Sequence, residues 1–238
     1  MKRIILMVLR NLWFVPYGLI KLYYMAAHVD KYTEEEKFKF VKYIDYRANR
    51  GGNLNVEASG LENIPSENGF IFYPNHQGMY DVLAIVEVLD CPISVVMKKE
   101  VANVPFLKQV FALIGAISLD RSDIRQGLKV IQQVAEEVKQ GRNYIIFAEG
   151  TRSKMGNKLL EFKGGSFKSA VKAQCPIVPV ALIDSYKSFD TNSIKKLTVQ
   201  VHFLEPIAYE EYKSMKTVEI AAMVKERIED TIARYEKI

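Results

Sequence analysis

Short apolar runs separated by polar turns dominate the chain from residue 53 onward. The runs at 70–73, 93–97, 144–148 and 177–182 are too short for amphipathic helices and fit buried strands. In other segments apolar residues recur at helical steps, namely 81–89, 124–138 and 218–235. This alternation predicts an α/β fold with a mixed, mostly buried sheet covered by helices.

Single residues predict where some of these elements begin and end. Ser122 can cap the helix that Gly141 ends. Pro179 interrupts the 177–182 run, which predicts an edge strand or a bulge. Thr33 and Glu36 form a capping box at the start of a helix that runs to about Arg47 and ends at Gly51-Gly52.

Residues 4–29 are strongly apolar and aromatic, but Arg10, Pro16 and Lys21 interrupt them. The longest uncharged window, 11–20, falls short of the ~20 residues that a spanning helix needs. Residues 1–29 carry four basic side chains and no acidic one. Together with the next helix, this segment predicts a membrane-associating helical hairpin over 1–52, followed by an α/β domain over 53–238.

The N-terminal segment has other interpretations. Tyr and Trp favour the headgroup level, which indicates a kinked helix lying in one membrane face. A shallow re-entrant or spanning segment and a core helix covered by the domain remain alternatives. A cleaved signal peptide fits least, because the apolar run before Arg10 is short and no clear cleavage site follows.

Composition is typical of a globular enzyme. The 238 residues include 49% apolar residues, and 33 basic against 28 acidic residues give a net charge of +5. Cys91 and Cys175 lie beside prolines in apolar sequence, which indicates reduced thiols in a cytosolic protein. The histidines at 28, 76 and 202 are scattered, so no metal site is expected, and neither a Gly-x-Ser-x-Gly nor a nucleotide-binding loop occurs.

The stretch 69–81 combines a strand, a polar turn and a helix start, and it carries His76 and Asp81. On a regular helix, positions five apart lie about 140° from each other and cannot meet. Gly78 lets the backbone bend, so Asp81 can reach one imidazole nitrogen and leave the other able to take a proton. Alternatively, His76 is an ordinary turn histidine and Asp81 a helix cap, and the pair alone does not distinguish the two.

Three further loops place polar side chains after buried strands. These loops are Lys98-Lys99, Asp120-Arg121 and Glu149-Gly150-Thr151-Arg152. Ligands of open α/β sheets gather outside strand ends, so the loops are expected to meet the His76 turn. Their cations suit a phosphate, although each alone is more typical of a solvated surface charge.

Four blocks of the chain, within residues 54–183, resemble the lysophosphatidate acyltransferase family of glycerophospholipid synthesis. Residues 75–81 match its histidine, four residues, aspartate motif, and 98–121, 147–153 and 177–182 resemble its other three blocks. The chain departs from the family pattern at two positions: Gly78 stands where serine is frequent, and Ser118 stands where an aromatic residue is frequent. These departures bear on the preference for the acceptor substrate more than on the type of reaction. The resemblance makes 53–238 an α/β acyltransferase domain.

The resemblance implies that His76 deprotonates the sn-2 hydroxyl of 1-acylglycerol 3-phosphate, which attacks an acyl-CoA or acyl carrier protein thioester, while Asp81 orients His76. Arg152 and Lys98, with Arg121 as a weaker candidate, would hold the acceptor phosphate. Glu149 with Gly150 would shape the glycerol site, and Thr151 would be a further substrate-binding residue. It implies no cofactor and a place on the cytoplasmic face of the cell membrane, peripheral or shallowly inserted.

Two rival classes stay open. One is a related acyltransferase that uses glycerol 3-phosphate or another lysolipid. The other is a non-catalytic protein that binds a membrane surface or nucleic acid, which the basic balance alone supports. Nucleic acid is disfavoured, because the aromatic residues concentrate in the acid-free N-terminal segment rather than along a basic groove.

Overall fold

The computed structural model describes residues 2–236, and within them seven strands form one sheet in the order β1-β7-β6-β2-β5-β3-β4. Neighbouring strands are parallel except β6 and β7, which are antiparallel. The strands are β1 (Leu54–Ser59), β2 (Ile71–Pro74), β3 (Ser94–Lys98), β4 (Ile117–Leu119), β5 (Tyr144–Ile145), β6 (Ile177–Ile183) and β7 (Leu197–Phe203). The prediction of a mixed α/β fold is therefore confirmed.

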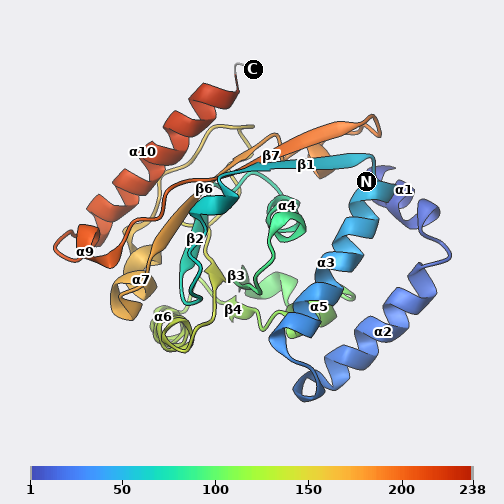
Figure 1. Cartoon of the computed structure of the whole chain (residues 1–238), viewed down its shortest axis with the longest axis horizontal. Coiled ribbons are helices and arrows are strands. Elements are labelled where there is room, and N and C mark those ends of the chain that lie inside the picture. The colour runs from blue at the N-terminus through green and yellow to red at the C-terminus, as the bar shows by residue number, and fades with distance from the viewer. Residues whose placement is uncertain (1, 237–238) are drawn as a thin grey trace.

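Helices cover both faces of the sheet (Figure 1). Side chains alternate along β2, so Phe72 packs into the core on one face and Ile71 and Tyr73 into the core on the other. The first face carries α3 (Glu34–Gly51), α4 (Asp81–Val88) and α5 (Leu107–Leu113), and the second carries α6 (Ile124–Lys139), α7 (Lys168–Ala173) and α10 (Thr217–Tyr235). The α/β part of the chain also contains two short helices, α8 (Lys187–Asp190) and α9 (Tyr209–Tyr212).

Two local predictions are wrong. Strand β6 is not an edge strand, because it lies between β7 and β2. The Pro179 carbonyl accepts the N–H of Leu204, just beyond the last paired residues of β6 and β7. The nitrogen and carbonyl of one strand residue point to the same side, so the Pro179 nitrogen faces the end of that pairing. Proline is tolerated there because few hydrogen bonds of the sheet depend on its missing N–H. Helix α6 is capped by Asp123 rather than Ser122, since the Asp123 carboxylate accepts the N–H of Gln126.

The N-terminal segment forms α1 (Lys2–Arg10) and α2 (Val15–Ala27), which bend by 97° at the break between them. Pro16 stands in the first turn of α2, where its missing N–H is not needed. The Thr33–Glu36 capping box at the start of α3 is confirmed. Among residues 2–236 no single helix is long and apolar enough to cross a membrane, although α1 and α2 taken together reach the required length and composition.

Helices α1 and α2 also pack against the rest of the chain. Met7, Leu22 and Met25 belong to the same core as α3 and the sheet, so the core continues across the expected boundary at residue 52. Arg3 is 2% exposed and donates to the carbonyls of Ser188, Gly52 and Lys195. This buried arginine joins α1 to distant segments and does not face a membrane.

Candidate active site

The candidate residues lie at or after the carboxyl ends of β2, β3, β4 and β5. Strands β2, β3, β4, β5 and β6 run parallel where they pair, so their carboxyl ends lie on the same side. His76 follows β2, Lys98 ends β3, Arg121 follows β4 and Glu149 follows β5. The four loops therefore leave the sheet on the same side, and the loop after β5 contacts the His76 turn.

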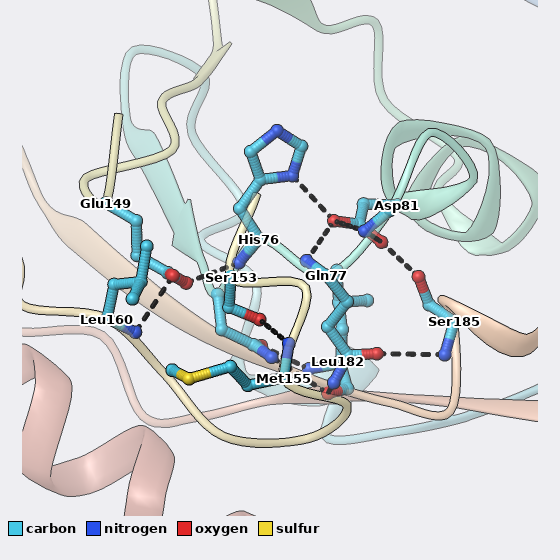
Figure 2. Close-up of polar contacts among 11 residues, drawn as sticks. His76, Gln77, Asp81, Glu149, Ser153, Met155, Leu160, Leu182 and Ser185 are labelled. Carbon is cyan, nitrogen blue, oxygen red and sulfur yellow. Dashed lines mark hydrogen bonds and ion pairs between the residues drawn. The ribbon is translucent and has the colours of Figure 1, made fainter. Parts of the chain in front are cut away.

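The imidazole of His76 is held on two sides. Its Nδ1 lies 2.7 Å from Oδ2 of Asp81, and its ring stacks on Phe147 with centroids 4.0 Å apart. The His76 side chain is 20% exposed, while that of Asp81 is fully buried. The predicted contact between the two residues is therefore present, and the second ring nitrogen points away from the carboxylate (Figure 2).

The buried carboxylate of Asp81 accepts several hydrogen bonds besides the imidazole contact. The backbone N–H of Gln77 donates to Oδ2 at 2.7 Å, and the N–H of Gly78 lies 3.0 and 3.1 Å from the two oxygens. The hydroxyl of Ser185 donates to Oδ1. These donors replace the water that a buried carboxylate loses, and they define one orientation for it.

The backbone of His76 is fixed by the segment after β5. Glu149 accepts the His76 N–H on Oε1 at 2.6 Å and the Leu160 N–H on Oε2 at 3.0 Å, and the N–H of Ser153 donates to the His76 carbonyl at 2.8 Å (Figure 2). Glu149 is 2% exposed, and burial raises the pKa of its carboxyl. Both oxygens of Glu149 are thus engaged beneath the histidine.

The predicted phosphate ligands differ in their surroundings. Lys98 is paired with Glu100 at 2.9 Å, and its neighbour Lys99 contacts Asp120. Arg152 is half-buried and Arg121 exposed, and neither forms an ion pair with any residue in 2–236. Of the two arginines, Arg152 is the one next to Ser153, whose N–H donates to the His76 carbonyl.

Comparison with known proteins identifies the family. A model of the acyltransferase family matches residues 55–183. The chain belongs to this family. It is 31% identical to the 1-acyl-sn-glycerol-3-phosphate acyltransferase of Salmonella typhimurium and 32% identical to that of Escherichia coli, over 77% of this chain and 75% of each relative. The resemblance found in the sequence is confirmed, and the chain is an O-acyltransferase.

A solved structure shares the fold of this acyltransferase. The 1-acyl-sn-glycerophosphate acyltransferase PlsC of Thermotoga maritima superposes with a TM-score of 0.74. The match covers 98% of both chains at 22% identity. It therefore extends over the N-terminal helices as well as the sheet.

One cation beside the Glu149–Arg152 loop was missed by sequence reasoning. The N–H of Lys163 donates to the carbonyl of Ala148, and the Lys163 side chain lies over Gly150. A Cβ at Gly150 would stand 3.0 Å from Nζ of Lys163, and the φ of +72° at Gly150 favours glycine. The only signal in the sequence is the Phe-Lys-Gly-Gly segment at 162–165, which is too short for a nucleotide-binding loop and has no other motif.

Thr151 and His202 differ in their exposure. Thr151 is exposed on the same loop as Gly150. His202 is buried in β7 against Ser59 and Tyr235, and burial lowers the pKa of its imidazole. Within residues 2–236 no three His, Cys, Asp or Glu side chains are arranged to hold a metal ion.

Proposed function

We propose that this acyltransferase moves a fatty acyl group from a thioester, acyl-CoA or acyl carrier protein, to the sn-2 hydroxyl of 1-acylglycerol 3-phosphate, giving phosphatidic acid. The names of the bacterial relatives support the acceptor. One observation supports His76 as the general base: its Nδ1 is held by buried Asp81 while its other ring nitrogen points away from that carboxylate.

The reaction needs one proton acceptor and no covalent acyl-enzyme. His76 Nε2 takes the hydroxyl proton as the hydroxyl oxygen attacks the thioester carbon. The carbon–sulfur bond then breaks, and the imidazolium returns the proton to the departing thiolate. Asp81 keeps the proton on Nδ1 before the attack and stabilises the imidazolium formed during it.

In this proposal Arg152 binds the acceptor phosphate, and Lys98 and Lys163 lie at the periphery of the phosphate site. Arg152 offers a bidentate fork, and burial of part of its side chain strengthens an ion pair relative to a fully solvated one. Arg121 is more exposed, and Lys98 already has an acidic neighbour. Arg152 is therefore the first phosphate ligand we assign.

The acyltransferase is also proposed to lie on the cytoplasmic face of the cell membrane through α1 and α2. Their outer surface exposes large apolar side chains, among them Trp13 at 98%, Ile20 at 73% and Leu9 at 57%. Such a surface on a soluble monomer is unfavourable, whereas the interfacial region of a bilayer accepts aromatic and aliphatic side chains. The lipid acceptor would then reach His76 from the bilayer.

The decisive experiment is acyl transfer by purified protein in lipid vesicles. Lysophosphatidate, glycerol 3-phosphate and a lysolipid with another head group are each offered with acyl-CoA and with acylated carrier protein. We expect transfer to lysophosphatidate, and loss of about 10²- to 10⁴-fold in His76→Ala, since that is the usual contribution of a general base. His28→Ala, at the end of α2, is the matched control.

Two outcomes contradict the proposal. Preference for another acceptor would reassign the substrate. A His76→Ala variant that keeps more than about a tenth of the wild-type turnover would remove His76 as the base.

A further inference from the structure

Ser185 lies just beyond the end of β6, outside the segment that matches the family model. Its side chain is fully buried, and its hydroxyl donates to Oδ1 of Asp81. The other oxygen, Oδ2, contacts His76. The hydroxyl and the imidazole therefore hold opposite oxygens of one carboxylate (Figure 2).

We propose that Ser185 is a positioning residue of the acyltransferase, which fixes Asp81 and through it the tautomer and orientation of His76. The inference rests on the proposed role of His76 as the base. It adds a residue that a histidine, four residues, aspartate motif does not contain.

Ser185 is held in place by Gln77, which also contacts the end of β6. Its N–H donates to Oε1 of Gln77 at 2.9 Å, and the amide of Gln77 donates to the Leu182 carbonyl and to Asn157, both at 2.8 Å. Gln77 is the neighbour of His76, so β6 and the histidine loop are joined at the serine. The hydroxyl is thus directed at Asp81 before any substrate binds.

Removal of the hydroxyl would leave Oδ1 with a single donor among residues 2–236. That donor is the N–H of Gly78 at 3.1 Å, which also lies 3.0 Å from Oδ2. With only this shared donor on Oδ1, the carboxylate is less restrained about its Cβ–Cγ bond, and the imidazole that depends on it is less firmly oriented. The effect should appear in kcat rather than KM, since Ser185 is buried away from substrate.

The test compares Ser185→Thr with Ser185→Val. These two side chains have similar volume, and only threonine keeps the hydroxyl, so any cost of added bulk cancels. We expect kcat for the valine variant to be lower by about tenfold or more, with KM for both substrates unchanged. Ser188→Ala is the control, because Ser188 is equally buried on the adjoining α8 and its hydroxyl has no hydrogen-bond partner among residues 2–236.

Two further measurements separate positioning from a general structural role. In an Asp81→Asn background, Ser185→Val should cause little loss beyond that of Ser185→Thr, since the pathway through Asp81 is already broken. ¹⁵N NMR of the His76 ring should show a smaller fraction of the Nδ1-protonated tautomer in the valine variant than in the threonine variant.

Equal kcat values for the two variants would overturn the inference, as would a full additional loss in the Asp81→Asn background or an unchanged tautomer ratio. Full activity of His76→Ala would instead overturn the proposed function. The two failures are therefore distinguishable.

Discussion

The carboxylate of Glu149 accepts the backbone N–H of His76 at 2.6 Å, so the residue expected in the glycerol site lies behind the candidate base. Its second oxygen accepts the N–H of Leu160. Because each oxygen already accepts a backbone N–H and the side chain is only 2% exposed, we expect Glu149 to support the histidine loop rather than to bind the acceptor.

Glu149→Gln should lower kcat and thermal stability together. The amide keeps one acceptor oxygen but places an NH₂ group against a backbone N–H, which leaves a buried donor unpaired at a cost of about 1–3 kcal/mol. Glu161→Gln is the control, because the Glu161 side chain is 90% exposed. A glutamine variant with normal stability and a raised acceptor KM would return Glu149 to the substrate site.

Arg152→Ala and Lys163→Ala should each raise the acceptor KM. A hydrogen bond to a charged group contributes roughly 1.5–3 kcal/mol, which corresponds to about one to two decades for Arg152. The more exposed Lys163 should give a smaller increase. Steady-state kinetics with the acyl donor held saturating measure this, with Lys139→Ala, at the far end of α6, as control. Equal losses with an acceptor that lacks phosphate would contradict the assignment.

Replacing Leu9, Trp13 and Ile20 by serine should release the protein from anionic vesicles. Each buried aliphatic or aromatic side chain contributes about 1.5–3 kcal/mol, so the triple variant should bind at least about a hundredfold more weakly. Vesicle sedimentation measures the change, and Val218→Ser, 63% exposed on α10, is the control.

Substitution is preferable here to deletion of residues 1–29. Deletion would also remove Arg3, Met7 and Leu22, which are buried against the rest of the chain. Loss of activity would then report unfolding rather than detachment. Undiminished vesicle binding by the folded triple variant would exclude α1 and α2 as the membrane contact.

Asp45→Asn should stabilise the protein at neutral pH. Asp45 is buried in α3 with no partner for Oδ2 among residues 2–236, and burial, together with the nearby Glu87, raises its pKa well above the usual value. A carboxyl whose pKa is higher in the folded state stabilises the fold fully below the unfolded pKa of about 3.9, and this stability is lost as pH rises toward the folded pKa.

Asparagine carries no such charge, so the free energy of unfolding of Asp45→Asn should fall less over that pH range than that of the wild type. Urea unfolding of both proteins from acid to neutral pH measures the difference. Tyr80, Glu87 and Arg3 also act on this buried region, and they are unchanged in the variant. The control is Asp230→Asn, at an exposed position of α10. A lower stability of Asp45→Asn at neutral pH would contradict the prediction.

Local sequence was sufficient for much of this protein. Apolar periodicity predicted most strands and helices. The contact between His76 and Asp81 was inferable because the two residues are close in sequence, Gly78 lies between them and Asp81 begins α4. The exposed aromatic residues of α2 and of the turn before it follow from the same kind of pattern.

Only the tertiary structure decided which polar groups are buried and what they contact. Ser185 reaches Asp81, Glu149 reaches the His76 backbone and Arg3 reaches Ser188, each across a large separation in sequence. Pro179 could enter a central strand because a neighbouring ladder ends beside it. Sequence periodicity describes which face of an element is apolar, whereas the partner of a buried polar atom depends on how distant elements pack.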